Sequence, residues 1–302
     1  MASTLLQLVD RAANELSLSA PATVISNSNQ EVVQLLALIN AVGYELQADH
    51  DWQRIVKEYR TTMVKYSYTG DTTNAITSVT NMSSITGLSA RFMVTGTGIE
   101  EDTYVSSAVG TTVTLSRAAS ATNTTVTLTF SQTQYTLPSD FDHIVDDTQW
   151  SKTDNWRILG PKTGQEWQLL KSGLISSGPR MRFRILGGYF QIWPPDGSQD
   201  YIGFEYVSDQ WVLAAADSVT PSKASFTVDT DTCVFNDTLM VLGLKSKYMI
   251  AKGWLDPYGR SFEILKATEI ADDAGSKTLS MAPRASEVLL GESNIPDSGF
   301  GS

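Results

Sequence analysis

The stretch from Thr69 to Phe130 has the composition of β structure and constrains the fold more than any other segment. Its 62 residues include 17 threonines and 8 serines but only six charged residues. β-Branched side chains fit the pleated, half-buried surface of a strand. Residues 112–115 and 125–130 also alternate polar and apolar side chains, with the period of two that a strand imposes. We therefore predict a small all-β module over residues 69–130.

The residues on either side of this stretch predict a host domain into which the module is inserted. Residues 65–68 and 134–137 both have strand character, so the two ends of the module are expected to lie close together. The host resumes over residues 131–235. There, Gly187 and Gly188 separate two strand-like runs, which indicates an antiparallel hairpin within a β platform.

Helices are predicted at both ends of the chain, which makes the expected fold class α+β. Residues 1–68 should hold a helical hairpin and the first host strand, with Ser28 and Glu31 forming a capping box for the second helix. Residues 236–274 should hold the C-terminal helices, beginning at Asn236 or Asp237 and interrupted by Pro257. Together these helices are expected to form one bundle layer. Residues 275–302 are rich in Ser, Gly and Pro, so we expect a flexible tail that only partners would order.

Charge and residue usage exclude several classes of function. The 302 residues carry 22 Lys and Arg against 33 Asp and Glu, a formal net charge of −11, and such a surface repels a phosphate backbone. A single cysteine, Cys233, excludes an internal disulfide and a cysteine-built zinc site. We predict no metal, no cofactor and no catalytic residue. The first residues lack a basic segment followed by an apolar run, so no secretory signal is expected.

Short motifs that resemble known sites are better explained structurally. His50 and His143 lie near aspartates, yet no metal-binding or nucleophile pattern accompanies them, so capping or surface roles are expected. Residues 96–98 (GTG) lack the third glycine of a phosphate loop and are interpreted as a turn. Residues 229–232 (DTDT) lack the glycine and glutamate of a calcium loop and are interpreted as solvated turn carboxylates.

Two groups of side chains are candidates for contacts with other subunits. Arg180, Arg182 and Arg184 alternate with apolar residues, which would place all three on one strand face as candidates for a subunit or nozzle interface. Five tryptophans, at positions 150, 156, 167, 193 and 211, are expected in the core or at an interface.

The order of many weak matches along the host resembles a known family. The matching segments are residues 135–141 (YTLPSDF), Trp150, residues 159–161 (LGP), 165–168 (QEWQ), 178–184 (GPRMRFR), 204–208 (FEYVS) and Trp211, with Asp51-Trp52 closing the N-terminal hairpin. In this order they resemble the head-to-tail adaptors of short-tailed bacteriophages, the tail tubular protein A family. The resemblance covers residues 1 to about 274 except 69–130, and the inserted segment is similar to small Ig-like β repeats.

The resemblance implies a virion structural protein without enzymatic activity. It implies a homo-oligomeric ring, twelvefold in the family, that joins the portal protein to the tail nozzle protein and forms part of the DNA ejection channel. The protein would be made in the bacterial host cytoplasm and reside in the phage neck. DNA would be passing cargo only. The purpose of residues 69–130 is left open: such an inserted module would touch tail fibres, capsid or host glycans, or would widen the ring.

Two other functions are open on the sequence. The Thr-rich segment and the tryptophans could belong to a tail-associated carbohydrate-binding or host-attachment protein. Alternatively, Asp146, Asp147 or Glu166 could serve a glycan hydrolase, although carboxylates in short stretches are too common to indicate catalysis.

Overall fold

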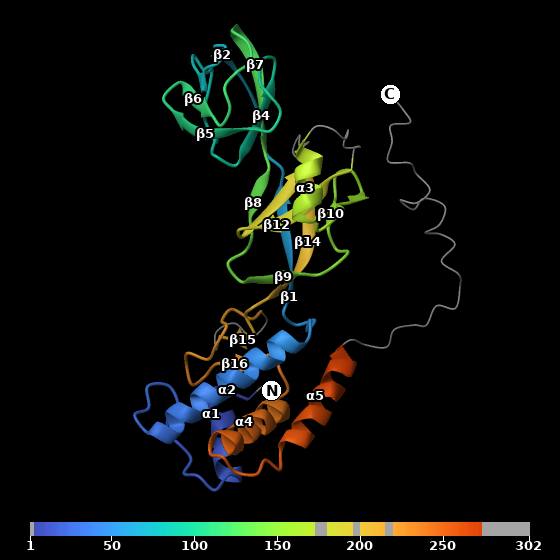
Figure 1. Cartoon of the computed structure of the whole chain (residues 1–302). Coiled ribbons are helices and arrows are strands. Elements are labelled where there is room, and N and C mark those ends of the chain that lie inside the picture. Colours follow the sequence, from blue (N-terminus) through green and yellow to red (C-terminus); the bar gives the residue numbers. More distant parts are fainter. Residues whose placement is uncertain (1–2, 173–179, 196–199, 215–219, 274–302) are drawn as a thin grey trace, which may run out of the picture. The chain divides into compact units, whose positions relative to one another are not determined.

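The chain is a mixed α+β protein, which confirms the predicted class. The computed structural model describes residues 3–172, 180–195, 200–214 and 220–273, and these contain five helices and several antiparallel sheets (Figure 1). The chain separates into two compact units. Of the described residues, one unit, here the helical unit, contains 3–57, 140–144, 205–214 and 220–273. The other, the β unit, contains 58–139, 145–172, 180–195 and 200–204.

Four helices dominate the helical unit. They are α1 (Leu5–Glu15), α2 (Gln30–Asp49), α4 (Asp237–Ala251) and α5 (Gly259–Asp273). Helix α4 packs against each of the other three, and Figure 1 shows the blue and orange helices side by side. Because α4 has neighbours on several sides, it buries residues such as Leu239, Met240, Leu244 and Tyr248 almost completely.

Helix starts follow local capping chemistry, with one correction to the prediction. Asn236 caps α4 as predicted, its side chain accepting a hydrogen bond from the Thr238 amide. The predicted cap of α2 was wrong by one residue: Asn29, not Ser28, accepts the Glu31 amide at 2.9 Å. Asn27 in turn accepts the amide of Asn29, and this turn holds Asn29 in the capping position.

Short strands complete the helical unit around a buried tryptophan. β9 (Phe141–Ile144) pairs with the end of β14 (Tyr201–Ser208), and β15 (Val212–Leu213) pairs with β16 (Thr232–Cys233). Trp211, next to β15, is fully buried against the aromatic rings of Phe226 and Phe235. The unit therefore has its own core, to which both halves of the sequence contribute.

A six-stranded antiparallel sheet in the β unit spans the Thr-rich segment. Its order is β2-β7-β4-β5-β6-β3, and its core contains Phe92, Val94, Leu128 and Phe130 among other buried apolar residues. Lys65 at the start of the sheet pairs with Ser131 at its end. The strands are β2 (Lys65–Thr72), β3 (Ser78–Val79), β4 (Phe92–Gly96), β5 (Thr103–Val109), β6 (Thr112–Leu115) and β7 (Asn123–Gln132).

A second sheet in the β unit has the order β12-β13-β8. Helix α3 (Gly164–Lys171) lies between β8 and β12 in the sequence. The strands are β12 (Arg182–Leu186), β13 (Tyr189–Trp193) and β8 (Gln134–Thr136). Gly187 and Gly188, both at positive φ, make the predicted turn between β12 and β13. The remaining sheet has the order β1-β14-β10-β11, with β1 (Val56–Thr62), β10 (Trp150–Ser151) and β11 (Trp156–Arg157).

Among the described residues, none of the helices has the length and apolar run needed to cross a bilayer. The predicted flexible tail, residues 275–302, lies outside the described residues.

Candidate functional site

The arginine row is only partly on a strand. Strand β12 begins at Arg182, so Arg180 precedes it, and the prediction of three arginines along one strand face was wrong for that residue. Arg182 and Arg184 do share a face, because they are two residues apart on β12. Arg182 is only 7% exposed, whereas Arg180 and Arg184 are partly exposed. Contact of Arg180 and Arg184 with another subunit or the nozzle remains a prediction.

The β12-β13-β8 sheet has one apolar and one polar face. Phe183, Phe190, Ile192 and Tyr135 lie on the apolar face and are almost fully buried. The opposite face carries a row of polar residues. Arg184 pairs with Gln191 on the neighbouring strand, and Gln191 pairs with Gln134 on the next. The period of two therefore places these three side chains side by side on one face.

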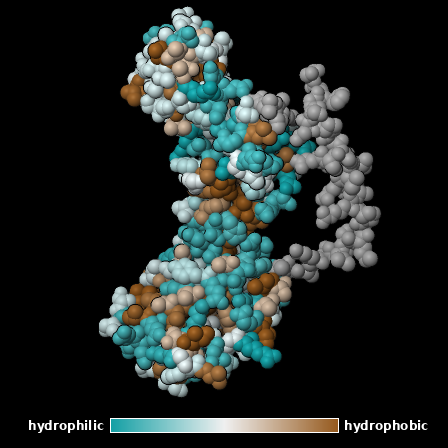
Figure 2. Space-filling view, in the orientation of Figure 1, coloured by the Kyte–Doolittle hydropathy of each residue, from teal (hydrophilic) through white to brown (hydrophobic). Residues whose placement is uncertain are grey.

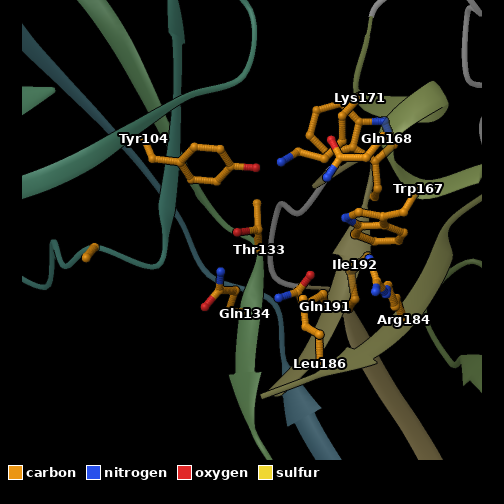
Figure 3. Close-up of a pocket in the computed structure, with 12 residues that line it drawn as sticks. Tyr104, Thr133, Gln134, Trp167, Gln168, Lys171, Arg184, Leu186, Gln191 and Ile192 are labelled. Carbon is orange, nitrogen blue, oxygen red and sulfur yellow. The ribbon is translucent and has the colours of Figure 1, made fainter. Parts of the chain in front are cut away.

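The polar face forms the floor of a cavity of about 250 Å³ within the β unit. Figure 3 shows Gln191 between Gln134 and Arg184, with Trp167 of α3 above Arg184. The wall opposite comes from the six-stranded sheet. The cavity is lined by Ala90, Tyr104, Thr133, Gln134, Trp167, Gln168, Lys171, Arg184, Leu186, Gln191, Ile192 and Trp193.

One wall of the cavity is held by an ion pair between α3 and the six-stranded sheet. Lys171 Nζ lies 2.9 Å from Asp102 Oδ1 and 5.0 Å from the centre of the Tyr104 ring. Burial, reinforced by the negative charge of Asp102, raises the pKa of the Tyr104 hydroxyl, so this phenol stays protonated at neutral pH. The charge of Lys171 is thus already neutralised by a neighbouring carboxylate.

Arg91 makes a second link at the edge of the same region. Its guanidinium donates to Thr136 Oγ1 at 2.8 Å and to the Tyr189 hydroxyl at 3.2 Å, and it stacks over the Tyr189 ring. Both partners belong to the β12-β13-β8 sheet. Hydrogen bonds and a cation–π contact to a planar guanidinium favour one orientation of the two sheets around the cavity.

The helical unit carries exposed apolar side chains at the end of α4, in the connection that follows it and on α5. Ile250, Trp254 and Leu255 are 63%, 60% and 91% exposed, and Ile264 on α5 is 60% exposed. Trp254 also makes an edge contact with Tyr248 of α4. Figure 2 shows brown, apolar residues on the surface of the helical unit among hydrophilic ones. We name these four residues the α4–α5 apolar patch.

The β unit exposes two tryptophans on one hairpin. Trp150 on β10 and Trp156 on β11 are 42% and 44% exposed. Their partners in the strand pairing are Arg157 and Ser151, so the two indoles lie on opposite faces of the hairpin. The other three tryptophans that were expected in the core or at an interface are less exposed: Trp167 and Trp211 are buried, and Trp193 is partly exposed. The expectation of a core role is confirmed for Trp167 and Trp211.

His143 is clamped between two aspartates of the helical unit. Its Nδ1 lies 2.9 Å from Asp142 Oδ2, and its Nε2 lies 2.9 Å from Asp51 Oδ1. Burial alone would lower the pKa of His143, but the hydrogen bonds with Asp142 and Asp51 outweigh it and raise this pKa. In this solvent-exposed site, His143 links Asp51, which follows α2, to Asp142 on β9.

Residues 229–232 support the fold with buried carboxylates. Asp231 is fully buried, accepting from Lys223 Nζ at 2.7 Å and from the Thr227 and Val228 amides. The prediction of solvated carboxylates was therefore wrong for Asp231. Asp229 accepts the amides of Val24 and Ile25, so this turn ties two distant segments together. The GTG segment is a turn as predicted, closed by the Ile99 amide donating to the Gly96 carbonyl.

Two of the three carboxylates suggested for glycan hydrolysis, Asp147 and Glu166, have structural partners. Asp147 pairs with Arg157 at the surface. Glu166 accepts hydrogen bonds from the amide and hydroxyl of Thr163 in the capping box of α3, and these interactions lower the pKa of Glu166. Among the described residues, no group of three His, Cys, Asp or Glu side chains is placed to hold a metal ion.

Sequence reasoning missed the three glutamines that line the cavity. Gln134, Gln168 and Gln191 come from three elements far apart in the sequence, and no motif links them. Only the alternation of β13 could have placed Gln191 on the same face as Trp193.

Comparison with known proteins gives no further guide to function. No protein-family model matches this chain, and comparison with curated proteins yields no significant match.

Proposed function

We propose that this chain is a virion structural protein of a short-tailed bacteriophage, a head-to-tail adaptor whose copies form a ring between the portal and the tail nozzle. The observation that carries the proposal is that each unit exposes large apolar side chains of its own. The helical unit has the α4–α5 apolar patch, and the β unit has Trp150 and Trp156. Large exposed apolar side chains are candidates for protein–protein contacts, and an adaptor needs separate surfaces for separate neighbours.

The finer architecture belongs to the same proposal. Helix α4 from the end of the chain packs on α1 and α2 from its start, which supports a helical layer that docks to the portal and to neighbouring subunits. The pairing of Lys65 with Ser131 brings the two ends of the Thr-rich segment together. This supports residues 69–130 as a module inserted into the host, with tail fibres or capsid as its proposed contacts.

The acidic composition suits a channel through which DNA passes. A net charge of −11 per copy, repeated around a ring of the family's twelvefold symmetry, would repel the phosphate backbone and reduce sticking during ejection. In this proposal DNA is passing cargo, the protein resides in the phage neck, and its work is assembly instead of catalysis.

The test is assembly of the purified full chain with the portal protein of the same phage, followed by electron microscopy and native mass spectrometry. We expect a ring of this protein seated on the portal ring. The variant Leu255→Asp places a charge on the most exposed residue of the α4–α5 apolar patch and should abolish or strongly weaken docking. Its matched control is Val109→Asp in the six-stranded sheet, where the side chain is 74% exposed, and this variant should still dock.

The proposal fails if the wild-type chain stays unassociated with the portal at concentrations where other connector components assemble. If Leu255→Asp docks as strongly as the wild type, the α4–α5 apolar patch is not part of the portal interface. Circular dichroism of each variant verifies that the loss of docking is not a loss of folding.

A specific observation also favours the second candidate, a carbohydrate-binding protein. The cavity on the β12-β13-β8 sheet combines amide side chains with aromatic rings, the two kinds of group that sugar sites use. An adaptor can carry such a site without losing its role in assembly.

A further inference from the structure

We infer that the cavity between helix α3, the β12-β13-β8 sheet and the six-stranded sheet binds one acidic sugar unit, a uronic acid or a similar carboxylated sugar. The inference concerns the β unit alone and does not depend on the connector function proposed above. It rests on four properties of the lining: an unpaired cation, a row of free amides, aromatic surfaces and the size of the space (Figure 3).

The first property is the guanidinium of Arg184. Among the described residues, no carboxylate or other acceptor pairs with it. A Cβ built on Gly164 would lie 3.5 Å from a guanidinium nitrogen of Arg184, which shows that the group reaches the start of α3. Lys171, the other cation of the lining, is already paired with Asp102. The cavity therefore presents a net positive charge, in a planar form that suits bidentate binding of a carboxylate.

The second property is a row of amides beside that charge. Gln191 lies between Arg184 and Gln134 in the strand register, and Gln168 faces them from α3. Within the described part of the chain, none of the three side-chain amides has a hydrogen-bond partner. Each amide offers both donors and an acceptor, which is what the hydroxyl groups of a sugar require, since a hydroxyl also donates and accepts.

The third property is the aromatic surface of the lining. Trp167 and Tyr104 flank the cavity from α3 and from β5, and Trp193 lies at the end of β13. A sugar ring has an apolar face of C–H groups beside its hydroxyls, and aromatic rings bury such a face well. A small anion such as free phosphate has no apolar face to pack against these rings.

The fourth property is size. The cavity of about 250 Å³ is smaller than the roughly 300–1,000 Å³ typical of sites for drug-sized ligands. A single sugar unit, or one unit of a longer glycan, therefore suits a cavity of this size better than a nucleotide or a folded peptide does.

The experiment compares two sugars that differ at one carbon. Galacturonate carries a carboxylate where galactose carries a hydroxymethyl group, and both are titrated into the full chain by isothermal titration calorimetry and by saturation-transfer NMR. We expect galacturonate to bind at least about tenfold more tightly than galactose, a difference that corresponds to about 1.4 kcal/mol. The variant Arg184→Gln, which removes the charge and keeps an amide, should bind both sugars equally weakly.

Two further variants make the result specific. Gln191→Leu removes the central amide and should weaken galacturonate binding by a similar factor while leaving Arg184 in place. Arg11→Gln removes the same charge from an exposed ion pair on α1 and should leave binding unchanged. Thermal unfolding of each variant verifies its fold.

Several outcomes would overturn the inference. If galacturonate and galactose bind equally tightly, the protein does not recognise the carboxylate. If Arg184→Gln binds galacturonate as tightly as the wild type does, the sugar does not bind at the proposed site. If acetate or the peptide unit N-acetylglutamate amide binds as tightly as galacturonate, the cavity recognises a carboxylate alone and the sugar assignment is wrong. Absence of binding at millimolar sugar also rejects it, and none of these results affects the portal-docking test, which uses the other unit.

Discussion

Gly43 in helix α2 lies directly under the indole of Trp211, and a Cβ atom built on Gly43 would overlap the ring. The glycine lets the fully buried Trp211 approach the helix backbone, where it also contacts Tyr44 edge-on. Glycine inside a helix costs about 1 kcal/mol relative to alanine. The close approach of the indole explains why the helix carries glycine at this position.

Gly43→Ala should therefore destabilise the protein although alanine favours helices. The overlap forces the indole or the helix to shift, and overpacking of this kind typically costs about 1–3 kcal/mol. Urea unfolding followed by tryptophan fluorescence measures the loss. Gly164→Ala is the matched control, because the new Cβ would meet only ordinary contacts at 3.5 Å and beyond, and it should be neutral or slightly stabilising. Equal stability of the two variants would contradict the packing argument.

The ion pair between Lys57 and Asp140 should make stability depend on pH in the acid range. Lys57 Nζ lies 2.6 Å from Asp140 Oδ2, and Ser208 and Tyr206 also donate to this carboxylate. Burial opposes ionisation, but these hydrogen bonds outweigh it and lower the pKa of Asp140. The stabilisation is then complete above the unfolded pKa of about 3.9 and is lost as pH falls through the lower folded pKa.

Asp140→Asn should cost roughly 3 kcal/mol at pH 7, since it leaves Lys57 without its counter-charge. The difference from the wild type should shrink towards pH 3 and below, as measured by urea unfolding at several pH values. Asp147→Asn breaks an exposed ion pair and should change stability by less than about 1 kcal/mol. A pH-independent difference for Asp140→Asn would rule out the electrostatic explanation.

The clamp of His143 by Asp51 and Asp142 should give a pH dependence of the opposite sign. Because the folded pKa is raised, its stabilisation is fully present below the unfolded pKa of about 6.5 and is lost as pH rises through the folded pKa. His143→Gln should lower the melting temperature more at pH 5 than at pH 8.5, by a small amount because the group is half exposed. In the variant Asp142→Asn, NMR titration should show a lower pKa for His143 than in the wild type. An unchanged pKa would show that Asp142 does not stabilise the protonated imidazole.

Cys233 should be unreactive in the folded protein. It is 2% exposed, and burial raises the pKa of its thiol to about 12, so almost no thiolate is present at neutral pH. Labelling with a thiol reagent at pH 8 should be slow in buffer and fast in denaturing urea. Fast labelling in buffer would show that β16 opens readily.

Local sequence is enough to predict much of the secondary structure. Asn236 marks the start of α4, Gly187 and Gly188 mark the hairpin between β12 and β13, and the Thr-rich alternation predicts the strands around residues 112–115 and 125–130. These features depend on contacts between residues that are close in the chain, so a short window contains the information. The α2 cap shows the limit of this approach, since Asn27 and Asn29 compete with Ser28 within three residues.

The surfaces that matter for function depend on contacts between distant residues. Gln134, Gln168 and Gln191 meet only because β8, α3 and β13 pack around one cavity, and the sequence holds no periodic relation among them. Arg182 and Arg184 have the same chemistry in the sequence, yet folding buries the first and leaves the second, unpaired, in the cavity wall. Capping and alternation are set by neighbouring residues, whereas burial and charge pairing are set by whichever segments the chain brings together.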